Sequence, residues 1–155
     1  MVTSGEDDDL RRGPVIAERQ LVLTLAADLT AAAASRAHLA TWLTAHGWPL
    51  AQREDLVLAV NEAVSNSVEH GYGVRSGDAG RPGPVKMTAE VVAADDRRWV
   101  EITVRDSGGW RSPLRPRAYR RHGIPIMRAC VAECVIDGTA SGTTVVLRSR
   151  PVPAC

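Results

Sequence analysis

The sequence predicts a two-layer α/β sandwich with a mixed sheet, because of the order of its helical and strand patterns. Helical patterns fill the first half of the chain, and paired strands with alternating apolar residues follow in the second half. The length of 155 residues fits one domain, and a chain with 45% apolar and 24% charged residues is neither collagen-like nor wholly disordered. The net charge of +1 lacks the basic excess of a dedicated DNA-binding protein.

The first half of the chain predicts one strand and two helices. A weakly alternating strand is expected at residues 20–26, and an Ala-rich helix at residues 30–45 is ended by a following glycine and proline. A second helix is expected at residues 51–70, followed by a loop rich in Gly and Pro at residues 71–84.

The second half predicts four strands and one helix. Alternating apolar residues place the strands at residues 85–91, 100–104, 135–137 and 143–148. The helix is expected at residues 124–132, because Pro125 is favoured at the start of a helix. The three cysteines do not suggest a disulfide framework. Cys130 and Cys134, four residues apart and expected on a helix, are interpreted as core thiols rather than metal ligands.

The ends of the chain carry no sign of export. Residues 1–14 are expected to form a disordered leader, residues 15–150 the folded domain and residues 151–155 a tail. The acidic N-terminus differs from a signal peptide, and no apolar run approaches the ~20 residues that cross a bilayer. We therefore expect a reduced, cytoplasmic protein.

The second helix carries the most informative side chains. Glu62, Asn66 and His70, spaced four residues apart, form a stripe roughly opposite an apolar side that includes Leu56 and Val60. Such a stripe is also what the solvated face of an ordinary amphipathic helix looks like. Poor helix formers in the middle of the helix favour a functional site instead, and these are Asn61, Ser65, Asn66 and Ser67.

Three further segments have the composition of a ligand site. Asp106 ends a strand just before Gly108, so a carboxylate lies beside backbone that a flat ligand such as adenine can approach. Gly123 leads into a helix whose free N–H groups can bind phosphate, and Thr143 opens the last strand, where its hydroxyl can reach a phosphate oxygen. Each segment alone is equally compatible with ordinary turn chemistry.

In order and spacing, these segments resemble the ATP-binding domain of the GHKL superfamily, and within it the RsbW-type anti-sigma factors that are also serine-protein kinases. The closest stretches are residues 56–73, 104–111, 122–131 and 141–148. The resemblance covers roughly residues 20–150. It implies the GHKL (Bergerat) fold, in which a mixed, mostly antiparallel sheet carries helices on one face.

The resemblance also implies roles for the residues of the second helix. Glu62 would be the general base that takes the proton from a substrate serine, and Asn66 the protein ligand of Mg²⁺. His70 would lie near the phosphates. ATP and Mg²⁺ are therefore the expected cofactors.

The glycine-containing segments that the family uses to bind nucleotide match the family pattern here, with one departure. Asp106 would accept a hydrogen bond from the adenine amino group, Gly108 would allow close approach, and Gly123 and Thr143 would contact the phosphates. Arg121 occupies the position of the first glycine in the family's G-x-G box. An arginine there either weakens nucleotide binding or adds a positive clamp, and both alternatives stay open.

By the same resemblance, the protein would bind a sigma factor and phosphorylate a STAS-type anti-anti-sigma antagonist. A homodimer is also compatible with the resemblance, whereas direct contact with nucleic acid or membrane is not expected. One alternative is a binding module that only sequesters a protein partner, with ATP binding retained or lost. A detached histidine-kinase catalytic domain is disfavoured, because no helical segment with a phosphoacceptor histidine precedes the nucleotide boxes.

Overall fold

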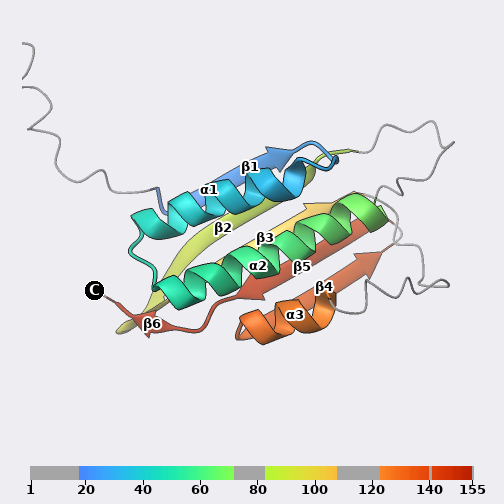
Figure 1. Ribbon diagram of the computed structural model, residues 1–155. Helices are drawn as coiled ribbons and strands as arrows, with labels where there is room; N and C mark the ends of the chain where they lie inside the picture. Colours follow the sequence, from blue (N-terminus) through green and yellow to red (C-terminus); the bar gives the residue numbers. More distant parts are fainter. Residues whose placement is uncertain (1–17, 72–82, 108–122, 140, 155) are drawn as a thin grey trace, which may run out of the picture.

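The computed structural model describes residues 18–71, 83–107, 123–139 and 141–154, which form two layers. Figure 1 shows the helices side by side on one face of a single sheet. The described helices are α1 (Ala31–Ala45), α2 (Leu50–Asn66), the short π-helix η1 (Ser67–Gly71) and α3 (Gly123–Cys130). The described strands are β1 (Gln20–Leu25), β2 (Val85–Ala94), β3 (Arg97–Asp106), β4 (Glu133–Thr139), β5 (Gly142–Arg148) and β6 (Val152–Pro153).

The sheet has the strand order β1-β2-β3-β5-β4, and β6 pairs with β3 outside this path. Each pairing among the described strands is antiparallel, so the parallel pairs of the expected mixed sheet are not found in them. The tight turn between β2 and β3 contains Asp95, whose φ of 53° is the left-handed conformation that Asp tolerates better than most residues. The expected α/β sandwich with helices on one face is confirmed.

The core lies between the two layers and matches the apolar side predicted for the second helix. Leu56, Val60 and Val64 of α2 are buried against the sheet. The strand β3 contributes its inward-facing residues Val100, Ile102 and Val104. Burial of a Val or Leu side chain stabilises a fold by about 1.5–3 kcal/mol, so this alternation fixes which face of each strand turns inward.

The second helix is shorter than the sequence predicted. The α-helix α2 ends at Asn66, four residues before His70, and the chain continues as the π-helix η1. The backbone N–H of Ser67 donates to the carbonyl oxygens of both Ala63 and Val64, a shared hydrogen bond that is common at the ends of α-helices. Short π-helical segments such as η1 are frequent at functional sites.

The position predicted for Cys134 is wrong. Cys130 is the last residue of α3, and Cys134 lies in β4 instead of on the same helix. This segment is a strand because it pairs with β5, where Glu133 lies opposite Arg148. Both thiols are only half-buried, and the described residues contain no cluster of three or more metal-ligating side chains.

The two described thiols are expected to react slowly at moderately alkaline pH. Burial raises the pKa of Cys130 and of Cys134 above the ordinary value of 9.0, because it disfavours the thiolate. At pH 8 we therefore expect iodoacetamide to label both residues more slowly in the folded protein than in urea, as followed by peptide mass spectrometry. Equal rates in the two states would contradict the burial of these thiols.

At its C-terminal end, the folded part of the chain extends further than expected. Val152 is buried and pairs with Arg98, so the sheet extends beyond residue 150 into the segment expected as a tail. Residues 1–14, expected as a leader, lie outside the described residues. Among the described helices, none has the length and apolar character that a membrane crossing requires.

Candidate functional site

Four segments from distant parts of the chain end at the same side of the molecule. Figure 1 shows the C-terminal end of α2, the end of β3, the start of β5 and the start of α3 at the right of the view. The π-helix η1, which continues α2, contacts both β3 and β5. The four segments singled out in the sequence therefore meet at this side.

Glu62 and Asn66 form the first half of the candidate site, together with Gly123. A Cβ atom added to Gly123 would lie 3.2 Å from Glu62 Oε2 and 3.4 Å from Asn66 Nδ2. The missing side chain thus allows the first residue of α3 to approach these two polar groups closely. Since Glu62 and Asn66 are half-buried beneath α3, they are not simply the solvated face of α2.

The start of α3 adds hydrogen-bond donors to this group. The first turn of a helix has backbone N–H groups without partners in the helix, and these can bind anions. Pro125 lacks an N–H, so Gly123, Ile124 and Ile126 supply the donors in this turn. A carboxylate, an amide and a set of N–H groups therefore lie together.

Asp106 and Thr143 form the second half of the candidate site. Asp106 ends the inward-facing row of β3 and is only 5% exposed, so its carboxylate lies on the helix side of the sheet. Thr143 lies opposite it on β5, and the Thr143 backbone N–H donates to Asp106 Oδ1 at 3.3 Å. The structure thus places Thr143 with Asp106, on strands next to each other in the sheet.

Gly142 is a residue of this site that reasoning from the sequence missed. Its φ of 152° is a conformation that L side chains rarely adopt, and an added Cβ would lie 2.1 Å from the carbonyl oxygen of Asp106. Only glycine allows the two backbones to approach this closely. The signal was a glycine at the first position of a strand, which the sequence alone does not distinguish from an ordinary turn glycine.

Three predicted site residues cannot be placed. Gly108 and Arg121 lie outside the described residues, and so does the side chain of His70. One of the poor helix formers has a structural explanation instead. Asn61 Oδ1 accepts a hydrogen bond from the Arg36 guanidinium, which joins α2 to α1.

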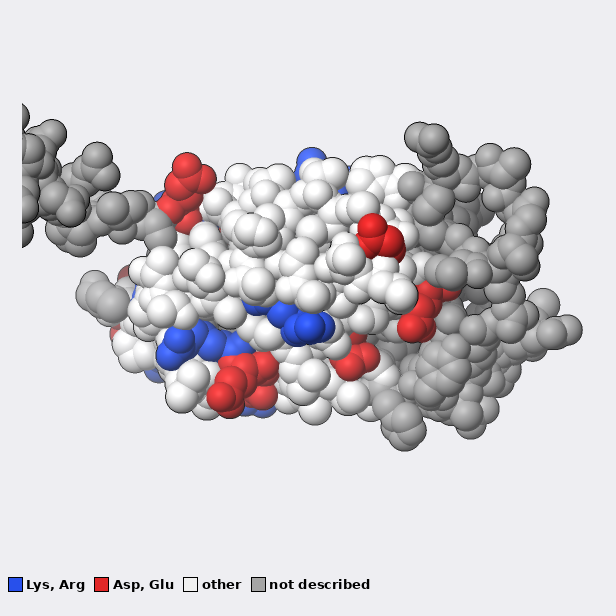
Figure 2. Space-filling view, turned by 45° about the horizontal axis from the view of Figure 1, so that its top comes forward, with Lys and Arg blue, Asp and Glu red and all other residues white. Residues whose placement is uncertain are grey.

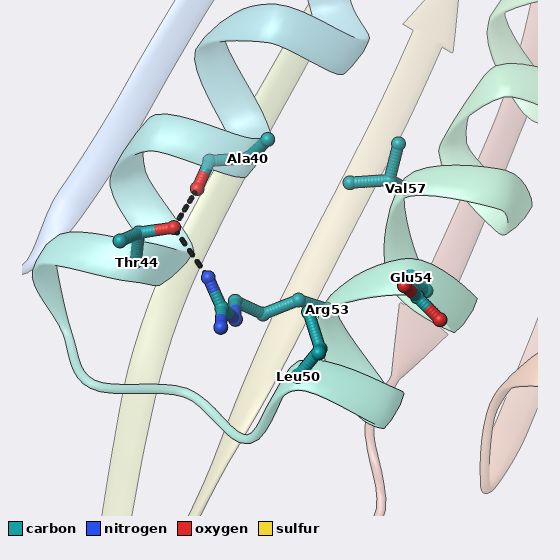
Figure 3. A pocket seen from close by; sticks show the side chains of 6 residues that line it. All are labelled: Ala40, Thr44, Leu50, Arg53, Glu54 and Val57. Atoms are coloured by element: carbon teal, nitrogen blue, oxygen red, sulfur yellow. Dashed lines mark hydrogen bonds between the residues drawn. The ribbon is translucent and has the colours of Figure 1, made fainter.

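A separate hollow of about 220 Å³ lies between α1 and α2, and Figure 3 shows its lining residues Ala40, Thr44, Leu50, Arg53, Glu54 and Val57. The Thr44 hydroxyl donates to the carbonyl oxygen of Ala40 and accepts from Arg53 Nη1, both at 2.8 Å. The hollow borders the first half of α2, whereas Glu62 and Asn66 lie in its second half. We therefore do not assign it to the candidate site.

Most of the described residues visible on the helix side in Figure 2 are uncharged. In Figure 2, the described Lys and Arg residues on this side form small groups with Asp and Glu nearby, and they do not make a continuous basic stripe.

Comparisons with known proteins agree with this geometry. Residues 25–149 match the histidine kinase-like ATPase domain. A crystal structure of the RsbU and RsbW domains of Rv1364c from Mycobacterium tuberculosis is 31% identical to the chain, with a TM-score of 0.66. The match covers 87% of this chain and 33% of that one, so the chain spans about a third of its length. The resemblance to RsbW-type proteins is thus confirmed, and the chain belongs to the histidine kinase-like ATPase family.

Proposed function

We propose that this chain is an ATP-dependent serine-protein kinase of the RsbW type that also binds a sigma factor. Membership of the histidine kinase-like ATPase family implies ATP binding. The observation that supports the proposal most is the close approach of Gly123 to Glu62 and Asn66. Phosphoryl transfer depends on positioning and charge stabilisation, and this contact brings phosphate-binding N–H groups to a carboxylate and an amide.

Asp106 is the proposed adenine-binding residue. Its buried carboxylate only accepts hydrogen bonds when ionised, which suits the adenine amino group. Thr143 lies beside Asp106, so this position favours a contact at the adenine end over the phosphate contact that the resemblance implies. Gly108 and His70 keep their expected roles as part of this proposal, and for Arg121 both expected alternatives stay open.

Asn66 and Glu62 are the proposed reactive pair. The Asn66 side-chain oxygen suits Mg²⁺, which prefers oxygen ligands and takes only one or two from the protein beside substrate phosphates. When bound, Mg²⁺ would neutralise charge on the phosphates. Glu62 takes the proton of the serine hydroxyl while the serine oxygen bonds to the γ-phosphorus, and the bond to the leaving ADP breaks.

The partners follow from the resemblance. We propose a sigma factor as the protein that is sequestered and a STAS-type antagonist as the phosphorylated substrate, in the cytoplasm. The second candidate is a module that binds a partner without phosphoryl transfer. Arg121 in place of a box glycine is the feature of the sequence that favours this second candidate, on the alternative in which its side chain weakens nucleotide binding.

Replacing Asp106 by asparagine is expected to weaken ATP binding. The new amide oxygen still accepts from the Thr143 N–H, so the fold is kept, but the amide N–H₂ faces the adenine amino group. An unpaired buried polar group costs roughly 1–3 kcal/mol, which corresponds to about 5- to 150-fold in the dissociation constant. Isothermal titration calorimetry with Mg²⁺ measures this change.

The matched control is Asp137→Asn, since Asp137 is exposed on β4. We expect this variant to bind ATP like the wild type. Equal affinities of the Asp106 and Asp137 variants would contradict the proposed adenine contact. A wild type without a calorimetric signal at millimolar ATP would contradict nucleotide binding altogether.

A further inference from the structure

Two arginines join α1 to α2 through exposed contacts. Arg36 on α1 donates to Asn61 Oδ1 on α2, and Arg53 on α2 donates in the other direction, to Thr44 Oγ1 on α1. On each helix the two contacts lie eight residues apart, which separates them by about 12 Å along the helix axis. Among the described residues neither arginine forms an ion pair, and the ion pairs found there involve Arg148. Two positive charges along this groove therefore have no carboxylate partner in the described part of the chain.

The hollow between α1 and α2 adds an apolar site beside one of these arginines. Ala40 and Val57 line it, and Leu50, which also lines it, is 61% exposed. Figure 3 shows the Arg53 side chain extending toward α1, whereas the Glu54 carboxylate points away from α1. Within the described residues, Arg53 Nε is buried without a hydrogen-bond partner. An apolar side chain next to a row of carboxylates would match this surface.

The segment before the described domain has this pattern of side chains. Residues 6–9 are one Glu followed by three Asp, and Leu10 comes directly after them. Leu10 is the only leucine among residues 1–17. An acidic run of four residues spans about 13 Å when extended, which matches the separation of about 12 Å between the two arginine contacts. A segment this polar does not form a core of its own, so any fixed place for it depends on the folded domain.

The start of the described chain lies at the same end of α1 as the hollow. The Glu18 carbonyl oxygen accepts from Trp42 Nε1 and from His46 Nε2, both at 2.9 Å. Eight residue steps lead from Glu18 back to Leu10, and they span at most about 29 Å. Half the circumference of a helix with its side chains is about 17 Å, so Leu10 can pass around α1 and reach the hollow.

We propose that residues 6–12 of this chain dock in the groove between α1 and α2. Leu10 fills the hollow, and the acidic run continues along the groove so that Arg53 and Arg36 each face a carboxylate. The docked segment covers this part of the helix layer, and a protein that binds here must first displace it. The docking does not depend on the proposed phosphoryl transfer, because the hollow is separate from the candidate site.

The order of charges in the segment selects the direction of docking. Arg11 and Arg12 follow Leu10 in the sequence, so they lie toward the C-terminal end of α1. The helix dipole makes that end negative, and the last turn of α1 contains no basic residue. The reverse direction would bring these two arginines to Arg36 and the acidic run to the negative end of α1. Like charges would then face each other at both places, which is unfavourable.

Cleavage by trypsin after Arg12 tests the docking in the whole chain, because a bound segment is cut only while it is out of the groove. The reference for an unbound segment is a synthetic peptide of residues 1–17. We expect the wild-type chain to be cut at least about fivefold more slowly than this peptide, as followed by mass spectrometry of the released fragment. Leu10→Ser should remove the protection. Val2→Ser is the matched control in the same segment and should keep it.

Charge reversal in the groove tests the ionic part of the contact. Arg53→Glu and Arg36→Glu should each reduce the protection, since the acidic run then meets a like charge. Arg97→Glu, at an exposed position on β3, is the matched control and should be cut like the wild type. Circular dichroism establishes that each variant is folded. Protection of the wild type should also decrease with added salt, which screens exposed charges.

Three results would overturn the proposal. The first is a wild-type chain that is cut as fast as the peptide, which would leave the groove to another partner. The second is protection that survives Leu10→Ser, because the hollow would then not hold this leucine. The third is protection that increases with protein concentration, which would show that the segment docks on a second copy instead of on its own domain.

Discussion

Replacing Gly142 by alanine is expected to destabilise the fold by roughly 2–6 kcal/mol. The backbone conformation of Gly142 costs a residue with a side chain about 1–3 kcal/mol, and forced overpacking adds about 1–3 kcal/mol. The overpacking arises because the new Cβ would lie 2.1 Å from the carbonyl oxygen of Asp106, and backbone cannot rotate away as a flexible side chain can. Urea unfolding followed by circular dichroism measures the loss.

Gly47→Ala is the matched control for this prediction. Gly47 also has a positive φ, of 63°, but a Cβ there meets no atom within 4 Å. It should therefore show only the cost of the left-handed conformation, about 1–2 kcal/mol. A Gly142 variant no less stable than the Gly47 variant would contradict the close approach of β5 to Asp106. If the Gly142 variant folds, displacement of Asp106 should also weaken its ATP binding.

Features that depend on local periodicity were predictable from the sequence. The two-residue alternation of β2 and β3 identified which side chains face inward, because one face of each strand is buried. The apolar spacing of Leu56, Val60 and Val64 likewise identified the buried side of α2. The association of Glu62 with Gly123 was not visible in periodicity and came only from the family resemblance.

Features that depend on a distant partner were not predictable. The spacing of Cys130 and Cys134 suits a helix, but the sheet supplies a partner strand for the second of them. Similarly, a glycine at position 142 has no special meaning until Asp106 lies beside it. In both cases an interaction with residues remote in the sequence overrides or defines the local preference.

Replacing Glu62 by glutamine is expected to lower phosphoryl transfer to a serine-bearing antagonist by about 10²- to 10⁴-fold. The amide keeps the size of the side chain and its place beneath α3, but it cannot take the serine proton. ATP affinity should change little, because a general base acts on the hydroxyl and does not hold the nucleotide. Asn66→Ala should instead lose both phosphoryl transfer and the increase in ATP affinity caused by Mg²⁺.

Transfer of radiolabelled phosphate to STAS-type proteins, run beside calorimetry on the same variants, separates these outcomes. The matched control is Glu54→Gln, because Glu54 is an exposed carboxylate on the same helix and borders the hollow between α1 and α2. This variant should transfer phosphate at the wild-type rate. If Glu62→Gln transfers phosphate equally fast, Glu62 is not the base.

If the wild type binds ATP and forms a complex with an antagonist but transfers no phosphate to it, the protein is a binding module. In that case Arg121→Gly tests whether the missing glycine prevents phosphoryl transfer. Transfer restored by this substitution would show that Arg121 causes the lack of kinase activity.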